Sequence, residues 1–258
     1  MKLKVSLLLL SLSALLVWWA VVAIPDSKLH VYFCDVGQGD GALVIQGSVQ
    51  LVIDTGPDDK ILNCLSRYMP FYDHTIEGVI ITHPQQDHMG GLSYIAESYS
   101  VIHIFIPPAN NDIRVYSKLM DLYRQNKVQV SNLYTGDKLT FGKVEFQSVW
   151  PSMVFTKANT ADLAAKVLGV KTDGTDLNSF SIVGILSYGQ TDILFTGDAD
   201  SSIDLAEIAT GLLRPVEILK VPHHGSKTGM SDEWLELVKP KTAIISVGKN
   251  NRYGHPAQ

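Results

Sequence analysis

Four short polar motifs stand out because each directly follows an apolar run of the kind that forms a buried strand. They are Asp-Thr-Gly at 54–56, His-Pro-Gln-Gln-Asp-His at 83–88, Gly-Asp at 197–198 and Pro-His-His-Gly-Ser at 222–226. In α/β proteins, ligand sites are built at the carboxyl ends of strands. We therefore expect the four motifs to converge on one pocket.

The side chains in these motifs predict a hydrolytic metal site. Histidine and aspartate are ligands of Zn²⁺ and Mn²⁺, and such a site leaves one position open for water. A bound metal lowers the pKa of that water to about 7, which provides a nucleophile without a serine or cysteine. One of the two adjacent histidines should bind the metal, while the other faces the substrate or protonates the leaving group. The candidate metal ligands are His83, Asp87, His88, Asp198, His223 and His224, and the candidate catalytic residues are Asp87, Asp198, His224 and Lys220.

The segments around the motifs predict strands interspersed with helices. Short runs rich in Val, Ile and Phe recur from Leu29 onward. Helical periodicity is clearest over 115–126 and 200–213, and the polar stretch 157–178 predicts a loop near the site. The chain has 258 residues, of which 46% are apolar, and this is enough for one α/β domain after a hydrophobic leader.

Five motifs, which follow one another along the chain in the family's order, resemble those of a known family. The stretch 83–88, followed by Met-Gly-Gly-Leu, resembles the H-x-H-x-D-H signature of the metallo-β-lactamase superfamily. Further resemblance to ComEC-type hydrolase domains lies in Asp-Val-Gly-Gln-Gly-Asp at 35–40, Asn-Ser at 178–179, Leu-Lys-Val-Pro-His-His-Gly-Ser at 219–226 and the segment 248–256. The resemblance implies an αββα sandwich, in which two mixed β-sheets are flanked by helices, and a metal-dependent hydrolase.

Two positions depart from the superfamily signature. Gln85 stands where many superfamily enzymes have histidine and the ComEC type often has aspartate, and Asn178 stands in place of a later histidine. Side-chain amides are weak, neutral ligands, so both residues are candidates for supporting the site or contacting the substrate instead. We expect one tightly held Zn²⁺ or Mn²⁺, with a second metal bound weakly or only together with substrate phosphate.

Other polar residues in the motifs are candidates for supporting the metal or the substrate. Asp54 either orients a ligand histidine or belongs to a turn or helix cap. Gln38 and Asp40 either make a polar contact in the site or close a tight glycine turn. The candidates for contacts with phosphate or the leaving group are Lys220, Ser226 and His255.

The resemblance implies hydrolysis of phosphodiester bonds, with single-stranded DNA outside the cytoplasm as the expected substrate. A metal-activated water opposite a phosphate, with Lys220 nearby, suits in-line attack. The formal net charge of -5 is unfavourable for binding a polyanion, so a local basic groove is required. Two alternatives stay open: hydrolysis of a small envelope phosphoester, and a decayed site that serves as a binding or scaffold domain in the envelope.

The segment 1–24 predicts a membrane anchor or a signal peptide. Lys2 and Lys4 precede an apolar run over 5–24, close to the roughly 20 residues that cross a bilayer. The positive charges place the N-terminus in the cytoplasm, whereas small residues at 21–23 allow cleavage and secretion instead. We favour the anchor, which makes a single-pass membrane protein with an extracytoplasmic hydrolase domain over 29–258. The family resemblance leads us to expect a truncated C-terminus.

Two cysteines, Cys34 and Cys64, do not have the C-x-x-C spacing of a zinc ribbon or redox motif. A disulfide between them is the alternative if the protein lies in an oxidising compartment. Free cysteine is among the most buried residue types, so we favour two buried free thiols.

Overall fold

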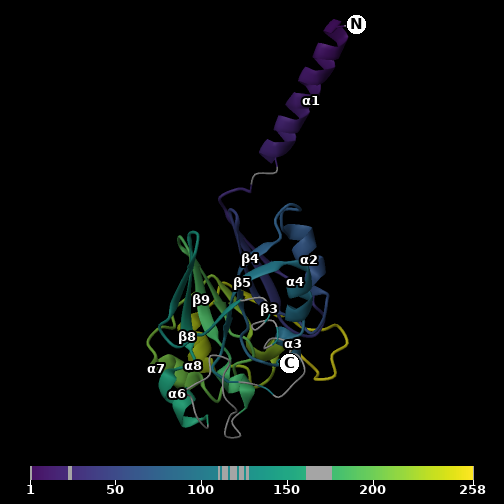
Figure 1. Ribbon diagram of the computed structural model, residues 1–258. Helices are drawn as coiled ribbons and strands as arrows, with labels where there is room; N and C mark the ends of the chain where they lie inside the picture. The colour runs from purple at the N-terminus through teal and green to yellow at the C-terminus, as the bar shows by residue number, and fades with distance from the viewer. Residues whose placement is uncertain are drawn as a thin grey trace.

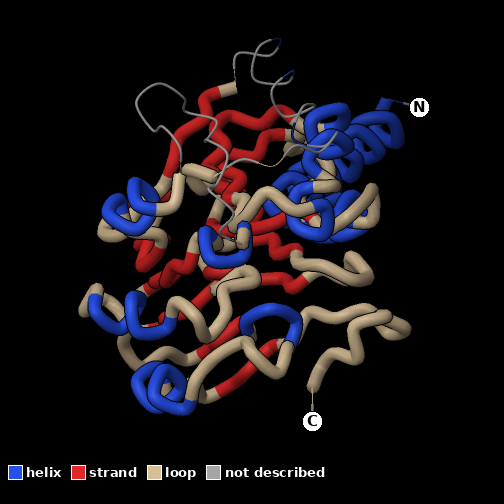
Figure 2. Tube along the Cα trace, turned by 90° about the horizontal axis from the view of Figure 1, so that it is seen from below, coloured by secondary structure: helices blue, strands red, loops and turns tan. Residues whose placement is uncertain are grey.

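Two six-stranded β-sheets pack face to face, with helices over the outer side of each sheet (Figure 1). Figure 2 shows the same arrangement from below, with the strands in red between groups of blue helices. This computed structural model describes residues 2–22, 25–109, 111, 116, 121, 125, 128–160 and 176–257. The predicted αββα sandwich with two mixed sheets is confirmed. Most of the predicted helix over 115–126, and residues 161–175 of the predicted loop, lie outside the described residues.

The first sheet positions the motifs at 54–56 and 83–88. Strands β1 to β3 pair antiparallel, and strands β3 to β6 pair parallel. Since β3 and β4 are parallel neighbours, the residues at their carboxyl ends lie at the same edge of the sheet. The strands are β1 (Leu29–Phe33), β2 (Gly41–Gln46), β3 (Val49–Thr55), β4 (Thr75–Ile80), β5 (Ser100–Ile106) and β6 (Gln129–Asn132).

The second sheet positions the motifs at 197–198 and 222–226. Strands β7 to β10 pair antiparallel, and strands β10 to β12 pair parallel. The parallel pair of β10 and β11 therefore brings these two motifs together at one edge, as β3 and β4 do in the first sheet. The strands are β7 (Lys138–Phe141), β8 (Val144–Trp150), β9 (Val183–Tyr188), β10 (Thr191–Phe195), β11 (Ile218–Lys220) and β12 (Thr242–Ile244).

Apolar side chains fill the space between the layers because successive residues of a strand face opposite sides of its sheet. On β2, Ala42 and Val44 pack in the cluster between the two sheets, whereas Leu43 and Ile45 pack in the cluster under the helices. A third cluster lies between the second sheet and its helices. The helices and short 3₁₀ turns after residue 25 are α2 (Ile61–Tyr68), α3 (Gln86–Met89), α4 (Leu92–Ser98), α6 (Met153–Ala158), η1 (Leu177–Phe180), α7 (Asp204–Ala209), η2 (Pro222–Gly225) and α8 (Asp232–Val238).

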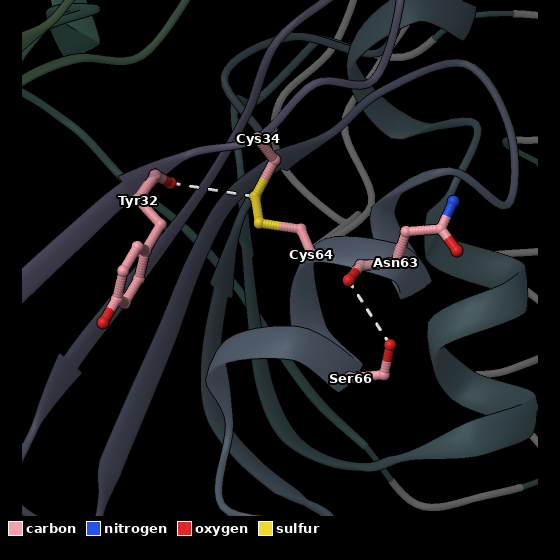
Figure 3. Close-up of a disulfide and its surroundings, with 5 residues drawn as sticks. All are labelled: Tyr32, Cys34, Asn63, Cys64 and Ser66. Carbon is pink, nitrogen blue, oxygen red and sulfur yellow. Dashed lines mark hydrogen bonds between the residues drawn. A yellow bond between two sulfur atoms is a disulfide. The ribbon is translucent and has the colours of Figure 1, made fainter.

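A disulfide joins Cys34, directly after β1, to Cys64 on helix α2 (Figure 3). The prediction of two free thiols is therefore wrong. Helix α2 presents Ile61, Cys64 and Leu65 to the sheet, since residues three and four apart share one face of a helix. The Cα atoms of the two cysteines are 5.7 Å apart, within the range that a disulfide spans.

The N-terminal segment forms helix α1 (Lys2–Val22). Across the part of the chain that the structure describes, no helix combines the length and the apolar character that crossing a membrane requires. The structure does not support the predicted membrane segment.

Candidate metal centre

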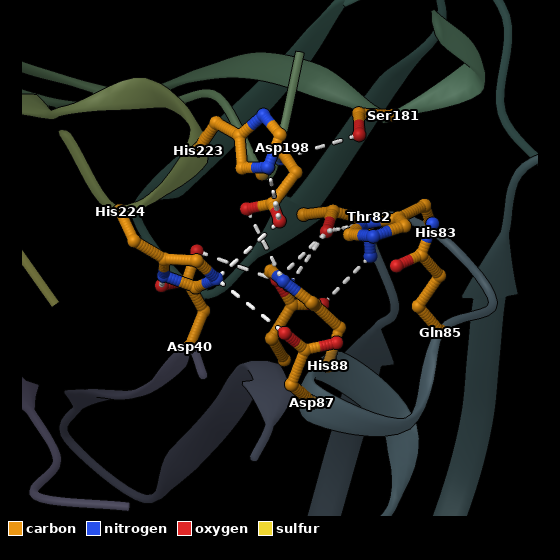
Figure 4. A network of polar contacts seen from close by, with 12 residues as sticks. Asp40, Thr82, His83, Gln85, Asp87, His88, Ser181, Asp198, His223 and His224 are labelled. Atoms are coloured by element: carbon orange, nitrogen blue, oxygen red, sulfur yellow. Dashed lines mark hydrogen bonds and ion pairs between the residues drawn. The ribbon is translucent and has the colours of Figure 1, made fainter. Parts of the chain in front are cut away.

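The four polar motifs meet at the edge of the sandwich where the parallel strands end. Figure 4 shows Asp87, His88, Asp198 and His224 pointing toward one another. Asp54 lies within the last two residues of β3, and the chain from His83 leads from β4 into α3. Asp198 follows β10, and His224 lies in the η2 turn that follows β11. Each sheet thus contributes two motifs to a single site.

Four side chains form a compact cluster at this edge: Asp87, His88, Asp198 and His224. Each offers one ligand atom, and these atoms lie within 4.8 Å of one another. Asp198 is the centre of the cluster, because its two carboxylate oxygens lie 3.2 Å from His88 Nε2 and 3.3 Å from His224 Nε2. The second imidazole also faces Asp87, at 3.6 Å between His224 Nε2 and Asp87 Oδ2.

The cluster has the polar atoms that a cation would satisfy. His88 Nε2, His224 Nε2 and Asp198 Oδ1 are buried, and apart from the ion-pair contacts within the cluster they make no hydrogen bond. Such atoms carry a desolvation cost that metal coordination would offset. Two imidazole nitrogens and two carboxylates suit Zn²⁺ or Mn²⁺, so the residues present fit a metal of this class.

Contacts behind the ligands fix the orientation of both imidazoles. Asp54 Oδ2 lies 2.8 Å from His88 Nδ1, and Asp54 Oδ1 accepts a hydrogen bond of 2.7 Å from the backbone N–H of Thr82. The carbonyl oxygen of Ser246 lies 2.9 Å from His224 Nδ1. With each Nδ1 engaged in this way, the two Nε2 atoms are the ones that face the cluster.

The structure distinguishes the two adjacent histidines. His224 belongs to the ligand cluster, whereas His223 Nε2 lies 3.9 Å from Asp198 Oδ2 and the His223 side chain is 28% exposed. Both residues have positive φ, 48° and 56°. This left-handed backbone is uncommon for residues other than glycine, and such strained residues cluster at active sites and ligand-binding sites.

His83 lies beside the cluster but outside it. Its ring centroid is 4.1 Å from that of His88, its Nε2 is buried without a hydrogen-bond partner, and burial lowers its pKa to about 3. Next to it, the amide of Gln85 donates a hydrogen bond of 2.7 Å to Asn178 Oδ1. The two residues that depart from the superfamily signature are therefore partners of each other.

Lys220 is buried, with 3% of its side chain exposed, and its ammonium group forms an ion pair with the buried carboxylate of Asp40. The ammonium also donates a hydrogen bond of 3.2 Å to the carbonyl of Gly197. Burial opposes the charge on Asp40, but Lys220 and the nearby imidazoles outweigh this effect and hold the Asp40 pKa below its usual value. Asp40 Oδ1 also lies 3.4 Å from His224 Nδ1, so the ion pair supports the ligand cluster from behind.

Burial and the neighbouring charges shift the pKa values of the clustered side chains in opposite directions. Burial alone would raise the pKa of Asp198, yet the imidazoles around it hold that pKa well below its usual range. Against the effect of burial, the carboxylates raise the pKa of His88 well above its usual value and that of His224 to about 12. An imidazole must be neutral to coordinate, so metal binding to this cluster is coupled to proton release.

The remaining candidates lie around the cluster. Gln38 Oε1 accepts a hydrogen bond of 2.9 Å from the backbone N–H of Gly248. The hydroxyl of Ser226 lies 3.3 Å from that of Thr228. The ring of His255 is 5.8 Å from that of His223. Sequence reasoning missed the supporting roles of Thr82 and Ser246, although Thr82 directly precedes the first histidine of its motif.

Comparison with known proteins gives a family and several relatives. The family model described as "Metallo-beta-lactamase superfamily" matches residues 34–249. ComE operon protein 3 of Bacillus subtilis (strain 168) is 28% identical over 284 residues, which covers 96% of this chain and 33% of that protein. Recombination protein 2 of Haemophilus influenzae is 27% identical over 226 residues, which covers 86% of this chain and 24% of that protein. The chain thus spans about a quarter to a third of the length of these two curated relatives.

The fold is also similar to solved structures. The metallo-β-lactamase fold protein YhfI from Bacillus subtilis has a TM-score of 0.51, with 87% of this chain and 88% of that chain covered. Sequence identity with this protein is 13%, so the likeness shows the fold alone.

Proposed function

Because this chain belongs to the metallo-β-lactamase superfamily, as its motifs predicted, we propose that it is a metal-dependent phosphodiesterase that cleaves single-stranded DNA. The observation that carries the proposal is the cluster of the half-buried Asp87 with the buried His88, Asp198 and His224, whose ligand atoms face one another. The names of two relatives, "Recombination protein 2" and "Competence protein ComA" of Neisseria gonorrhoeae, support a nucleic-acid substrate.

The side chains have separate tasks in the proposed reaction. Asp87, His88, Asp198 and His224 would hold Zn²⁺ or Mn²⁺, which supplies Lewis-acid activation of the substrate and of a water molecule. Asp54 and the carbonyl of Ser246 keep the two imidazoles in their coordinating orientation. His223 is partly exposed beside the cluster, where it would donate a proton to the leaving oxygen.

An activity screen of the purified full chain tests this function. With Zn²⁺ or Mn²⁺ added, we expect cleavage of single-stranded oligonucleotides and of bis(p-nitrophenyl) phosphate. Hydrolysis confined to p-nitrophenylphosphocholine would instead support a small envelope phosphoester as the substrate. Folded, metal-loaded protein that cleaves none of these substrates would contradict the proposal and favour the binding or scaffold role.

We expect the native chain to retain about one metal ion after dialysis against buffer, because the hydrogen-bonded amides of Gln85 and Asn178 offer only weak neutral ligands next to His83. The double change Gln85→His and Asn178→His should raise the metal content towards two. Metal per chain is measured by mass spectrometry of the dialysed protein.

Gln86→His is the matched control, since this neighbouring glutamine is exposed and donates its hydrogen bond to the carbonyl of Pro57. Its metal content should stay near one. Retention of two metal ions by the native chain would contradict the prediction that Gln85 and Asn178 weaken the second metal site.

We also propose that the hydrolase domain works outside the cytoplasm. The Cys34–Cys64 disulfide supports this location, because disulfides persist in oxidising compartments and are rare in the cytosol. Protease added to spheroplasts should digest the domain. Full protection of the domain in intact spheroplasts, with digestion only after lysis, would contradict the location.

A further inference from the structure

A row of rings leads from the candidate metal centre towards the surface. The centroids of His224 and His223 are 6.3 Å apart, and those of His223 and His255 are 5.8 Å apart. Tyr253 continues the row, since its ring is stacked on His255 at 5.8 Å with an interplanar angle of 13°. The tyrosine is 54% exposed, so the row ends on a ring that is open to solvent.

Hydrogen bonds fix the conformation of the segment 248–257, which carries the rings of Tyr253 and His255, and hold it next to the site. The side chain of Asn251 accepts hydrogen bonds from the backbone N–H groups of Tyr253 and His255, at 3.1 and 3.0 Å. Its amide donates to the carbonyl of His255 at 2.7 Å. The backbone N–H of Ala257 donates to the carbonyl of Gly225, next to the ligand histidine, at 2.8 Å. A ring held in place loses little conformational entropy when a ligand binds to it.

Positive charge accompanies the exposed ring. The guanidinium of Arg252 lies over the Tyr253 ring, with its carbon 5.1 Å from the centroid and its Nη2 3.0 Å from the hydroxyl, so a base that stacks on this face takes the place of the guanidinium. Arg252 and the neighbouring Lys249 are both exposed. These two residues give the segment that carries the ring two positive charges, in a chain whose formal net charge is -5.

We propose that Tyr253 is a stacking platform for an unpaired base of the substrate strand, and that Arg252 and Lys249 contact the backbone phosphates beside it. This inference rests on the proposed function and assigns a binding site for single-stranded nucleic acid next to the cluster. An exposed aromatic ring combined with basic side chains is the arrangement by which proteins hold single strands without reading their sequence. In a duplex the faces of the bases are stacked on each other, so the platform selects unpaired strands.

Binding without turnover tests the platform separately from catalysis. Fluorescence anisotropy is measured for the full chain in EDTA with a labelled oligo(dT) and with an oligonucleotide of the same length that lacks bases. The wild type should bind oligo(dT) about tenfold more tightly, since stacking on one aromatic residue contributes on that order per base. Tyr253→Ala and Tyr253→Leu should lose the preference for bases, whereas Tyr253→Phe should keep it.

Tyr72→Ala is the matched control. Tyr72 is 49% exposed and precedes the amino end of β4, opposite to the edge where the motifs meet. Its replacement should leave the preference for bases unchanged. Equal binding of both oligonucleotides by the wild type, or a preference that survives in Tyr253→Leu, would overturn the inference. If the protein hydrolyses phosphodiesters but binds both oligonucleotides equally, only the proposal for Tyr253 is refuted. If it prefers oligo(dT) but hydrolyses no phosphodiester, only the proposed phosphodiesterase activity is refuted.

Discussion

Asp198→Asn is expected to remove the retained metal and to lower phosphodiesterase activity by at least about a thousandfold, which corresponds to about 4 kcal/mol of transition-state stabilisation. Asp198 is the carboxylate that the imidazoles of His88 and His224 both face, at 3.2 and 3.3 Å. Asparagine keeps the volume of the side chain but loses the negative charge that holds a cation. Metal content after dialysis and the rate on bis(p-nitrophenyl) phosphate are the two measurements.

Asp59→Asn provides the control for this change, because Asp59 is an exposed carboxylate in the turn before helix α2. Metal content and rate should both stay at the wild-type level. A variant at position 198 that keeps its metal and its rate would show that the cluster is not the catalytic centre.

Lys220→Met is expected to destabilise the fold by about 3–5 kcal/mol, because removing one partner of a buried ion pair leaves the other charge uncompensated. Asp40 and Lys220 are both almost fully buried, so water cannot replace the lost ammonium group. Urea unfolding of the metal-free protein measures the change. The double variant with Asp40→Leu should recover part of the lost stability, since it removes the second charge as well.

Lys241→Met is the control for this prediction. Lys241 also pairs with a carboxylate, at 3.1 Å from Glu217, but its side chain is 74% exposed. Solvent screens such a pair, and its loss should change the stability little. A loss of stability in Lys220→Met as small as that in Lys241→Met would contradict the argument from the buried ion pair.

The edge that carries the site could be predicted from the sequence because it follows from local patterns, whereas the αββα sandwich was predicted from the family resemblance. The apolar runs before Asp54, His83 and Asp198 have the length and composition of buried strands. Since polar residues that follow parallel strands share one edge, strand pairing brings together the two motifs of each sheet, and packing of the two sheets joins the pairs. The four members of the ligand cluster were accordingly among the predicted ligands.

The choice among neighbouring side chains depended on the tertiary structure. His223 and His224 are identical and adjacent in the sequence, and the left-handed backbone of the turn, the carbonyl of Ser246 and the carboxylate of Asp40 together orient His224 into the cluster. The strand pattern that ends at Lys220 does not predict its ion-pair partner. Asp40 lies directly before β2 in the other sheet, far away in the sequence. The same holds for Cys34 and Cys64, whose pairing requires α2 to pack on the first sheet. Local composition determines which side chains reach the edge, and long-range packing determines which of them touch.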